Sequence, residues 1–213
     1  MTLGYTTPDE IFQKGINDLI HDILGDSFVK VLIDEVLIKE NIVANNSEIK
    51  CNIHLMTKNE VKTLQIENIA TGIVDALFCE IVTQLSKNFY SLKNIEFVDF
   101  SIAVHFKEKI KKSGVDAPAK VSLIIKNSEQ SRLYFDACSR SMNAGAIEVV
   151  RKAIEFLINA ELAAIDLYDR ITDAKERRRN DLVDQYTFNL IEIVKVTSYS
   201  TSIKKMSKKV LKP

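Results

Sequence analysis

Thr71-Gly72-Ile73-Val74-Asp75-Ala76-Leu77 is the stretch that decides the fold, because its order of residue types recurs at Ala144-Gly145-Ala146-Ile147-Glu148-Val149-Val150. Each stretch opens a segment whose apolar residues recur at helical spacing, over residues 71–89 and from about residue 144 onward. Each follows three segments in which apolar and polar residues alternate, as in half-buried strands. This order favours two copies of one β-β-β-α unit.

The expected fold class is therefore α+β, with two pseudo-symmetric β-β-β-α units, an N-terminal helix and a C-terminal helical extension. The expected strands cover residues 28–42, 49–55 and 61–66 in the first unit and residues 100–106, 121–125 and 133–137 in the second. A single unit of this kind leaves one sheet face and its edges open to water. We therefore expect the two units to pack about a pseudo-twofold axis and two chains to form a homodimer.

Composition shifts divide the chain into three parts. The first part holds a helix over residues 8–24, where Thr7, Pro8 and Glu10 give a capping box and Gly25 ends the helix. The boundaries that follow are 1–27 for this helix, 28–172 for the two units (about 28–90 and 93–170), and 173–213 for a charged helix followed by a basic, lysine-rich tail.

Composition and residue spacing exclude several classes of function. Lys plus Arg equals Asp plus Glu at 29 each, which removes the global field of a dedicated nucleic-acid binder. No signal peptide opens the chain and no apolar stretch is long enough to cross a bilayer, so we expect a cytoplasmic protein with no membrane contact. The three cysteines and three histidines lack metal-ligand spacing, and we expect no metal, no cofactor and no catalytic residues.

Four motifs carry a resemblance to a known family. They are Ala70-Thr71-Gly72-Ile73-Val74-Asp75-Ala76-Leu77, Val98-Asp99-Phe100, Ser113-Gly114-Val115-Asp116-Ala117-Pro118-Ala119-Lys120-Val121, and Ala146-Ile147-Glu148 with Asn159-Ala160. Together they resemble the C-terminal allosteric and dimerisation domain of 2-isopropylmalate synthases and citramalate synthases, over about residues 28–170. The catalytic barrel of those synthases takes roughly 250 residues, so these 213 residues do not hold both parts.

The resemblance implies a dimer that binds a branched-chain amino acid, leucine or isoleucine, and that regulates a separate catalytic synthase of amino-acid biosynthesis. Carried over by motif position, the effector-binding residues are Ala70, Gly72, Val74, Asp75, Phe97, Phe100, Val104, Ala117 and Ala119. In two places the sequence departs from the family pattern, since Ala70 replaces a glycine and Ile73 replaces a proline.

Elementary chemistry supports part of this assignment without the family. A helix start at Gly72 offers free backbone N–H groups to a carboxylate, and Asp75 in the first turn is placed to meet an ammonium group. The same residues also fit an ordinary apolar core, with Asp75 favoured by the helix dipole.

Two rival functions stay open. The chain is alternatively a dimerisation or interaction module that binds no ligand. A nucleic-acid-binding protein is the second alternative, indicated by the basic residues 177–179 and the lysine-rich tail. Nucleic-acid binding is the weaker of the two, because a charge run usually forms a solvated face and the strands show no aromatic stacking platform.

Overall fold

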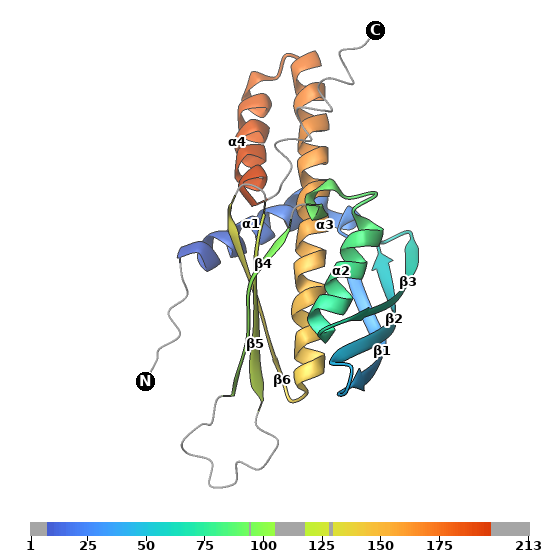
Figure 1. Cartoon of the computed structure of the whole chain (residues 1–213). Coiled ribbons are helices and arrows are strands. Elements are labelled where there is room, and N and C mark those ends of the chain that lie inside the picture. The colour runs from blue at the N-terminus through green and yellow to red at the C-terminus, as the bar shows by residue number, and fades with distance from the viewer. Residues whose placement is uncertain (1–7, 94, 105–117, 128–129, 197–213) are drawn as a thin grey trace.

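The computed structural model describes residues 8–93, 95–104, 118–127 and 130–196, and this part of the chain forms helices and two three-stranded antiparallel sheets (Figure 1). The elements in chain order are α1 (Pro8–Leu24), η1 (Gly25–Ser27), β1 (Lys30–Asn41), β2 (Asn46–Met56), β3 (Val61–Ala70), α2 (Ile73–Leu85), η2 (Tyr90–Leu92), β4 (Glu96–Val104), β5 (Ala119–Lys126), β6 (Arg132–Ser139), α3 (Met142–Glu176) and α4 (Asn180–Val196). The predicted α+β class and the order of its elements are confirmed.

The two sheets repeat one design in detail. Their strand orders are β1-β2-β3 and β4-β5-β6, and every pairing is antiparallel. The register shifts once in each first strand, between Ile33 and Val36 in β1 and between Phe97 and Asp99 in β4. Bulges of this kind are built features of a strand rather than defects, so their matching positions support a duplicated unit.

Several element boundaries differ from the predicted ones. Helix α1 has the predicted bounds, and Gly25 follows it with a φ of +48°, whereas Thr7 lies outside the described residues. Helix α2 ends at Leu85 rather than near residue 89, since the next residues turn into η2. Helix α3 runs without a break to Glu176, so the predicted boundaries at residues 170 and 172 fall inside it. The lysine-rich tail lies outside the described residues.

Helix α3 occupies the centre of the molecule, with one sheet on either side of it (Figure 1). Its first half is buried by β1 on one side and by β5 and β6 on the other. Helix α2 lies over β2 and β3 and also touches α3. The second half of α3 pairs with α4 and extends beyond the sheets as a helical hairpin, with α1 packed at its base (Figure 1).

Polar side chains of α3 cap the outer edge of β1. Asn159 accepts a hydrogen bond from the N–H of Val29 (2.8 Å) and donates one to its carbonyl oxygen (2.7 Å). The Glu155 carboxylate accepts the N–H of Val31 (2.7 Å), and Arg151 donates to the carbonyl oxygen of Val31 (3.1 Å). An edge strand exposes unpaired backbone groups, so these contacts both satisfy β1 and fix α3 against it.

Two of the other three sheet edges are capped in a similar way. Gln13 of α1 exchanges two hydrogen bonds with the backbone of Tyr134 on β6, and Gln84 of α2 donates to the carbonyl oxygen of Gln65 on β3. Within the described parts of the chain, no side chain hydrogen-bonds to the backbone of β4. Among the four sheet edges, that of β4 is therefore the one without a capping side chain from the described helices.

The two glycines that align in sequence do not occupy equivalent positions. Gly72 is the N-cap of α2, whereas Gly145 lies inside the first turn of α3. The N-cap of α3 is Ser141, whose hydroxyl oxygen accepts the N–H of Ala144 (3.2 Å). The sequence alignment is thus shifted by one helical turn at this point, because a side-chain cap rather than a glycine starts α3.

Replacing Gly145 by Ala is expected to destabilise the fold by about 1 kcal/mol. The added Cβ would lie 2.6 Å from Cγ2 of the buried Val121, and such overpacking costs about 1–3 kcal/mol against a gain in helix propensity of about 1 kcal/mol. Gly72→Ala is the matched control, since its Cβ would meet no atom within 4 Å and its φ of −152° suits any residue. Thermal denaturation measures both variants, and equal melting temperatures would contradict the packing described here.

Candidate functional site

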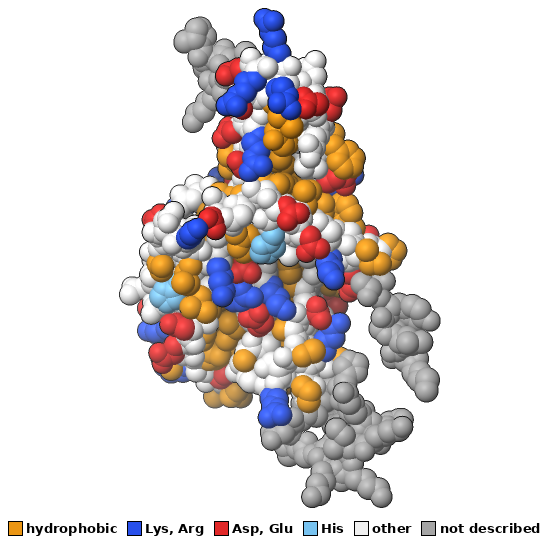
Figure 2. All heavy atoms as spheres, turned by 180° about the vertical axis from the view of Figure 1, so that it is seen from behind, with side chains coloured by type: hydrophobic (Ala, Val, Ile, Leu, Met, Phe, Trp, Pro, Cys, Tyr) orange, Lys and Arg blue, Asp and Glu red, His pale blue; other side chains and the backbone are white. Residues whose placement is uncertain are grey.

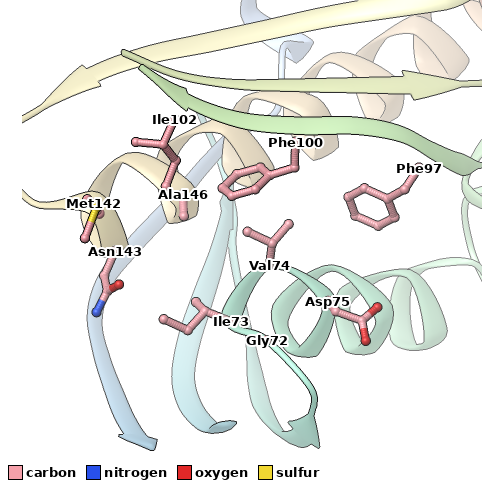
Figure 3. A pocket seen from close by; sticks show the side chains of 10 residues that line it. All are labelled: Gly72, Ile73, Val74, Asp75, Phe97, Phe100, Ile102, Met142, Asn143 and Ala146. Carbon is pink, nitrogen blue, oxygen red and sulfur yellow. The ribbon is translucent and has the colours of Figure 1, made fainter. Parts of the chain in front are cut away.

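An apolar pocket of about 490 Å³ opens where the N-termini of α2 and α3 approach β4 (Figure 3). We call it the slot, and its lining residues are Gly72, Ile73, Val74, Asp75, Phe97, Phe100, Ile102, Met142, Asn143 and Ala146. In Figure 3, Val74 points toward Phe100 and Ile73 points toward the start of α3. Pockets of this size and apolar lining are typical of small-molecule sites.

The helix of each unit faces the first strand of the other unit, α3 facing β1 and α2 facing β4. The slot exists because α2 covers β4 less completely than α3 covers β1. On β1, the first strand of one unit, the long helix α3 is seated along the edge. On β4, the first strand of the other unit, α2 makes an edge-to-face contact between Phe78 and Phe97, with ring centroids 4.6 Å apart. Past that contact Phe100 and Ile102 are 37% and 41% exposed. The apolar face of β4 beyond Phe97 therefore forms an open wall.

The helix starts at the slot differ in their capping. Ser141 caps α3, but Gly72 has no side chain and no side-chain hydrogen bond caps α2. The first intrahelical bond of α2 runs from the N–H of Ala76 to the carbonyl oxygen of Gly72. The preceding N–H groups of α2 accordingly keep their capacity to donate to an anion, in the partial positive charge of the helix start.

Asp75 is the one ionisable residue among those lining the slot. Its carboxylate accepts a hydrogen bond from the Cys79 thiol, with 3.2 Å between sulfur and oxygen. Although Cys79 is exposed overall, partial desolvation of its thiol, this hydrogen bond and the negative charge of Asp75 together raise the pKa of Cys79 to about 11. The slot thus combines an apolar interior, an uncapped helix start and one carboxylate.

The structure brings five of the predicted effector residues together and places the others elsewhere. Those lining the slot are Gly72, Val74, Asp75, Phe97 and Phe100.

Four predicted residues do not line the slot as described. Ala70 pairs with Ser47 at the end of β3, and Ala119 is buried at the start of β5. Val104 pairs with Ala119 through its backbone, but its side chain lies outside the described part of the chain, as does all of Ala117.

Five lining residues were missed by reasoning from the sequence: Ile73, Ile102, Met142, Asn143 and Ala146. Ile102 continues the alternation of Phe100 along β4, so the strand pattern itself would have identified it. The three from α3 come from the second copy of the unit, in which no effector-binding residue on the helix was predicted. Their signal was the duplication, because pseudo-symmetric units place both helix starts at one end of the molecule.

Metal clusters and membrane-spanning helices are absent from the described residues. These residues contain no cluster of His, Cys, Asp or Glu suited to a metal ion, and none of the described helices has the length and apolarity to span a membrane. His21 stacks on Phe28, and His54 hydrogen-bonds to Thr63.

No protein-family model matches this sequence, and no curated protein gives a significant match.

Asp75→Asn is expected to make Cys79 more reactive toward iodoacetamide. The negative carboxylate opposes formation of a thiolate beside it, so removing its charge lowers the pKa of the thiol and raises the thiolate fraction at about pH 8. Mass spectrometry of alkylation over time measures the rate, with the exposed Cys138 as internal reference. An unchanged Cys79 rate would show that Asp75 does not face the thiol.

Proposed function

We propose that this chain is a stand-alone regulatory module that binds a branched-chain amino acid, leucine or isoleucine, in the slot. The observation that carries the proposal is that five of the nine residues assigned by the family resemblance line one pocket. They come from α2 and β4, which are separate in sequence and meet only in the folded chain.

Each part of such a ligand has a counterpart in the slot. The aliphatic side chain fits the apolar space between Val74, Phe100 and Ala146. The carboxylate suits the uncapped N–H groups of α2. The ammonium group suits Asp75, one turn along the same helix start.

Regulation in this proposal acts on a separate catalytic synthase. The chain itself offers no metal cluster among its described residues, and the resemblance is confined to the regulatory part of those enzymes. Recovery of a barrel-type synthase with the chain from native cells would support this part of the proposal.

A dimerisation or interaction module without a ligand is the second candidate, favoured by β4. Its edge is uncapped by the described side chains, and this one strand carries four exposed large apolar residues: Phe97, Val98, Phe100 and Ile102. Exposed apolar strands of this kind mark surfaces that other chains cover.

Nucleic-acid binding gains no support from the charge run. Arg177 pairs with Asp173 (2.8 Å), and Arg179 pairs with Asp181 (2.8 Å). On the face seen in Figure 2, acidic and basic side chains are interspersed, and no broad basic patch forms.

Isothermal calorimetry with leucine, isoleucine and valine tests the first proposal. Leucine or isoleucine is expected to give saturable heat, and Asp75→Asn is expected to weaken binding about fivefold, which corresponds to about 1 kcal/mol for a partly solvated ion pair. Asp184→Asn on α4 is the matched control, because this exposed carboxylate lies in an element that does not line the slot. Absence of heat with all three amino acids would contradict ligand binding and favour the interaction module.

A further inference from the structure

The tip of the β1–β2 hairpin displays two branched aliphatic side chains. Ile42 is 85% exposed and Val43 is 99% exposed, more than any other large hydrophobic residue in the described ranges. The turn that carries them is ordered by its neighbours: Asn41 accepts the N–H of Ala44 (3.0 Å), and Asn45 adopts a φ of +50°. Turn tips ordinarily carry polar residues or glycine, so an ordered tip of Ile and Val indicates a surface that is covered.

The hairpin tip and the slot lie at the same end of the molecule. In the ladder of the first sheet, Asn41 pairs with Asn46 and the adjacent Ser47 pairs with Ala70, from which the chain passes directly to Gly72 in the slot. Figure 1 shows the end of β1 beside the starts of α2 and α3, and Figure 3 shows β1 running past Asn143. Three further exposed apolar residues occupy elements at this end: Leu37, Ile69 and Met142.

We propose that the hairpin tip of a second copy of this chain inserts Ile42 and Val43 into the slot. Each copy carries one tip and one slot at the same end. A twofold axis at that end therefore places the tip of each copy in the slot of the other. The occupant matches the site in chemistry, since aliphatic side chains enter a wall formed by Val74, Phe100 and Ile102.

Charge also favours this occupant. No charged residue lies between Glu40 and Glu48, so the tip itself carries no ion into the apolar pocket. The volume of the slot, about 490 Å³, leaves room for more than one branched side chain. The partner's tip thereby completes a pocket that the helices of one copy leave open.

A regulatory consequence follows where the proposed amino-acid binding also holds. A free amino acid and the partner's tip compete for the same slot, so the ligand favours separation of the two copies. This consequence rests on the proposed function, whereas the tip-in-slot contact does not.

Sedimentation equilibrium of the full chain tests the contact. The wild-type chain is expected to dimerise, and Val43→Asp is expected to weaken the dimer at least tenfold. Val61→Asp is the matched control: this valine is 57% exposed in the same sheet, but at the opposite end, beside the β2–β3 turn. Both substitutions are at exposed positions, so thermal denaturation is expected to show intact folds.

A complementation experiment separates this contact from any other dimer. Ile102→Asp disrupts the slot and leaves the tip intact, whereas Val43→Asp disrupts the tip and leaves the slot intact. An equimolar mixture of the two variants retains one good contact in each heterodimer, so it is expected to associate more strongly than either variant alone.

Three results would overturn the inference: a wild-type monomer at concentrations on the order of 100 μM, equal dimerisation of Val43→Asp and Val61→Asp, or a mixture no stronger than its components. Calorimetry with leucine and isoleucine on monomeric Val43→Asp reports separately on the amino-acid proposal. Binding heat without a tip-dependent dimer would contradict only the tip-in-slot contact. A tip-dependent dimer without binding heat would contradict only the proposed amino-acid binding.

Discussion

Everything in this fold depends on one helix that serves two sheets. Helix α3 buries its apolar faces against both β-β-β units, and inside that contact it carries polar side chains that are almost wholly enclosed. Asn159 satisfies the edge of β1, and the Glu161 carboxylate accepts the N–H groups of Tyr90 (2.8 Å) and Ser91 (2.7 Å) in the connection to the second unit. Unpaired polar groups would be costly there, so these bonds fix one position of α3.

In the described part of the chain, strand β4 has no helix seated along it as α3 is seated along β1. The helix of the first unit has 13 residues against the 35 of α3. It reaches β4 through Phe78 but does not extend over the strand as α3 extends over β1. An apolar wall and an uncapped helix start are consequently left open, and the exposed hairpin tip lies at the same end of the molecule. Both the proposed ligand and the proposed contact between copies arise from this single asymmetry.

Local periodicity predicted the fold, while packing decided its details. The bounds of α1 followed from Pro8 and Gly25, and the strands followed from alternation such as that of β5. Residue pattern predicted the start of α3 only to within two residues, because the hydroxyl of Ser141 sets it and Gly145 instead makes room for Val121. The part of the slot formed by α3 was missed for a similar reason, since contacts between distant elements leave no periodic signal.

Amide hydrogen exchange at Val29 and Val31, followed by NMR, tests the seating of α3 on β1 most directly. With Asn159 and Glu155 bonded to these two N–H groups, the edge amides are expected to exchange as slowly as that of Ile53 in the central strand β2. Exchange as fast as that of Val43 in the exposed turn would contradict the account, because α3 would then not hold both sheets.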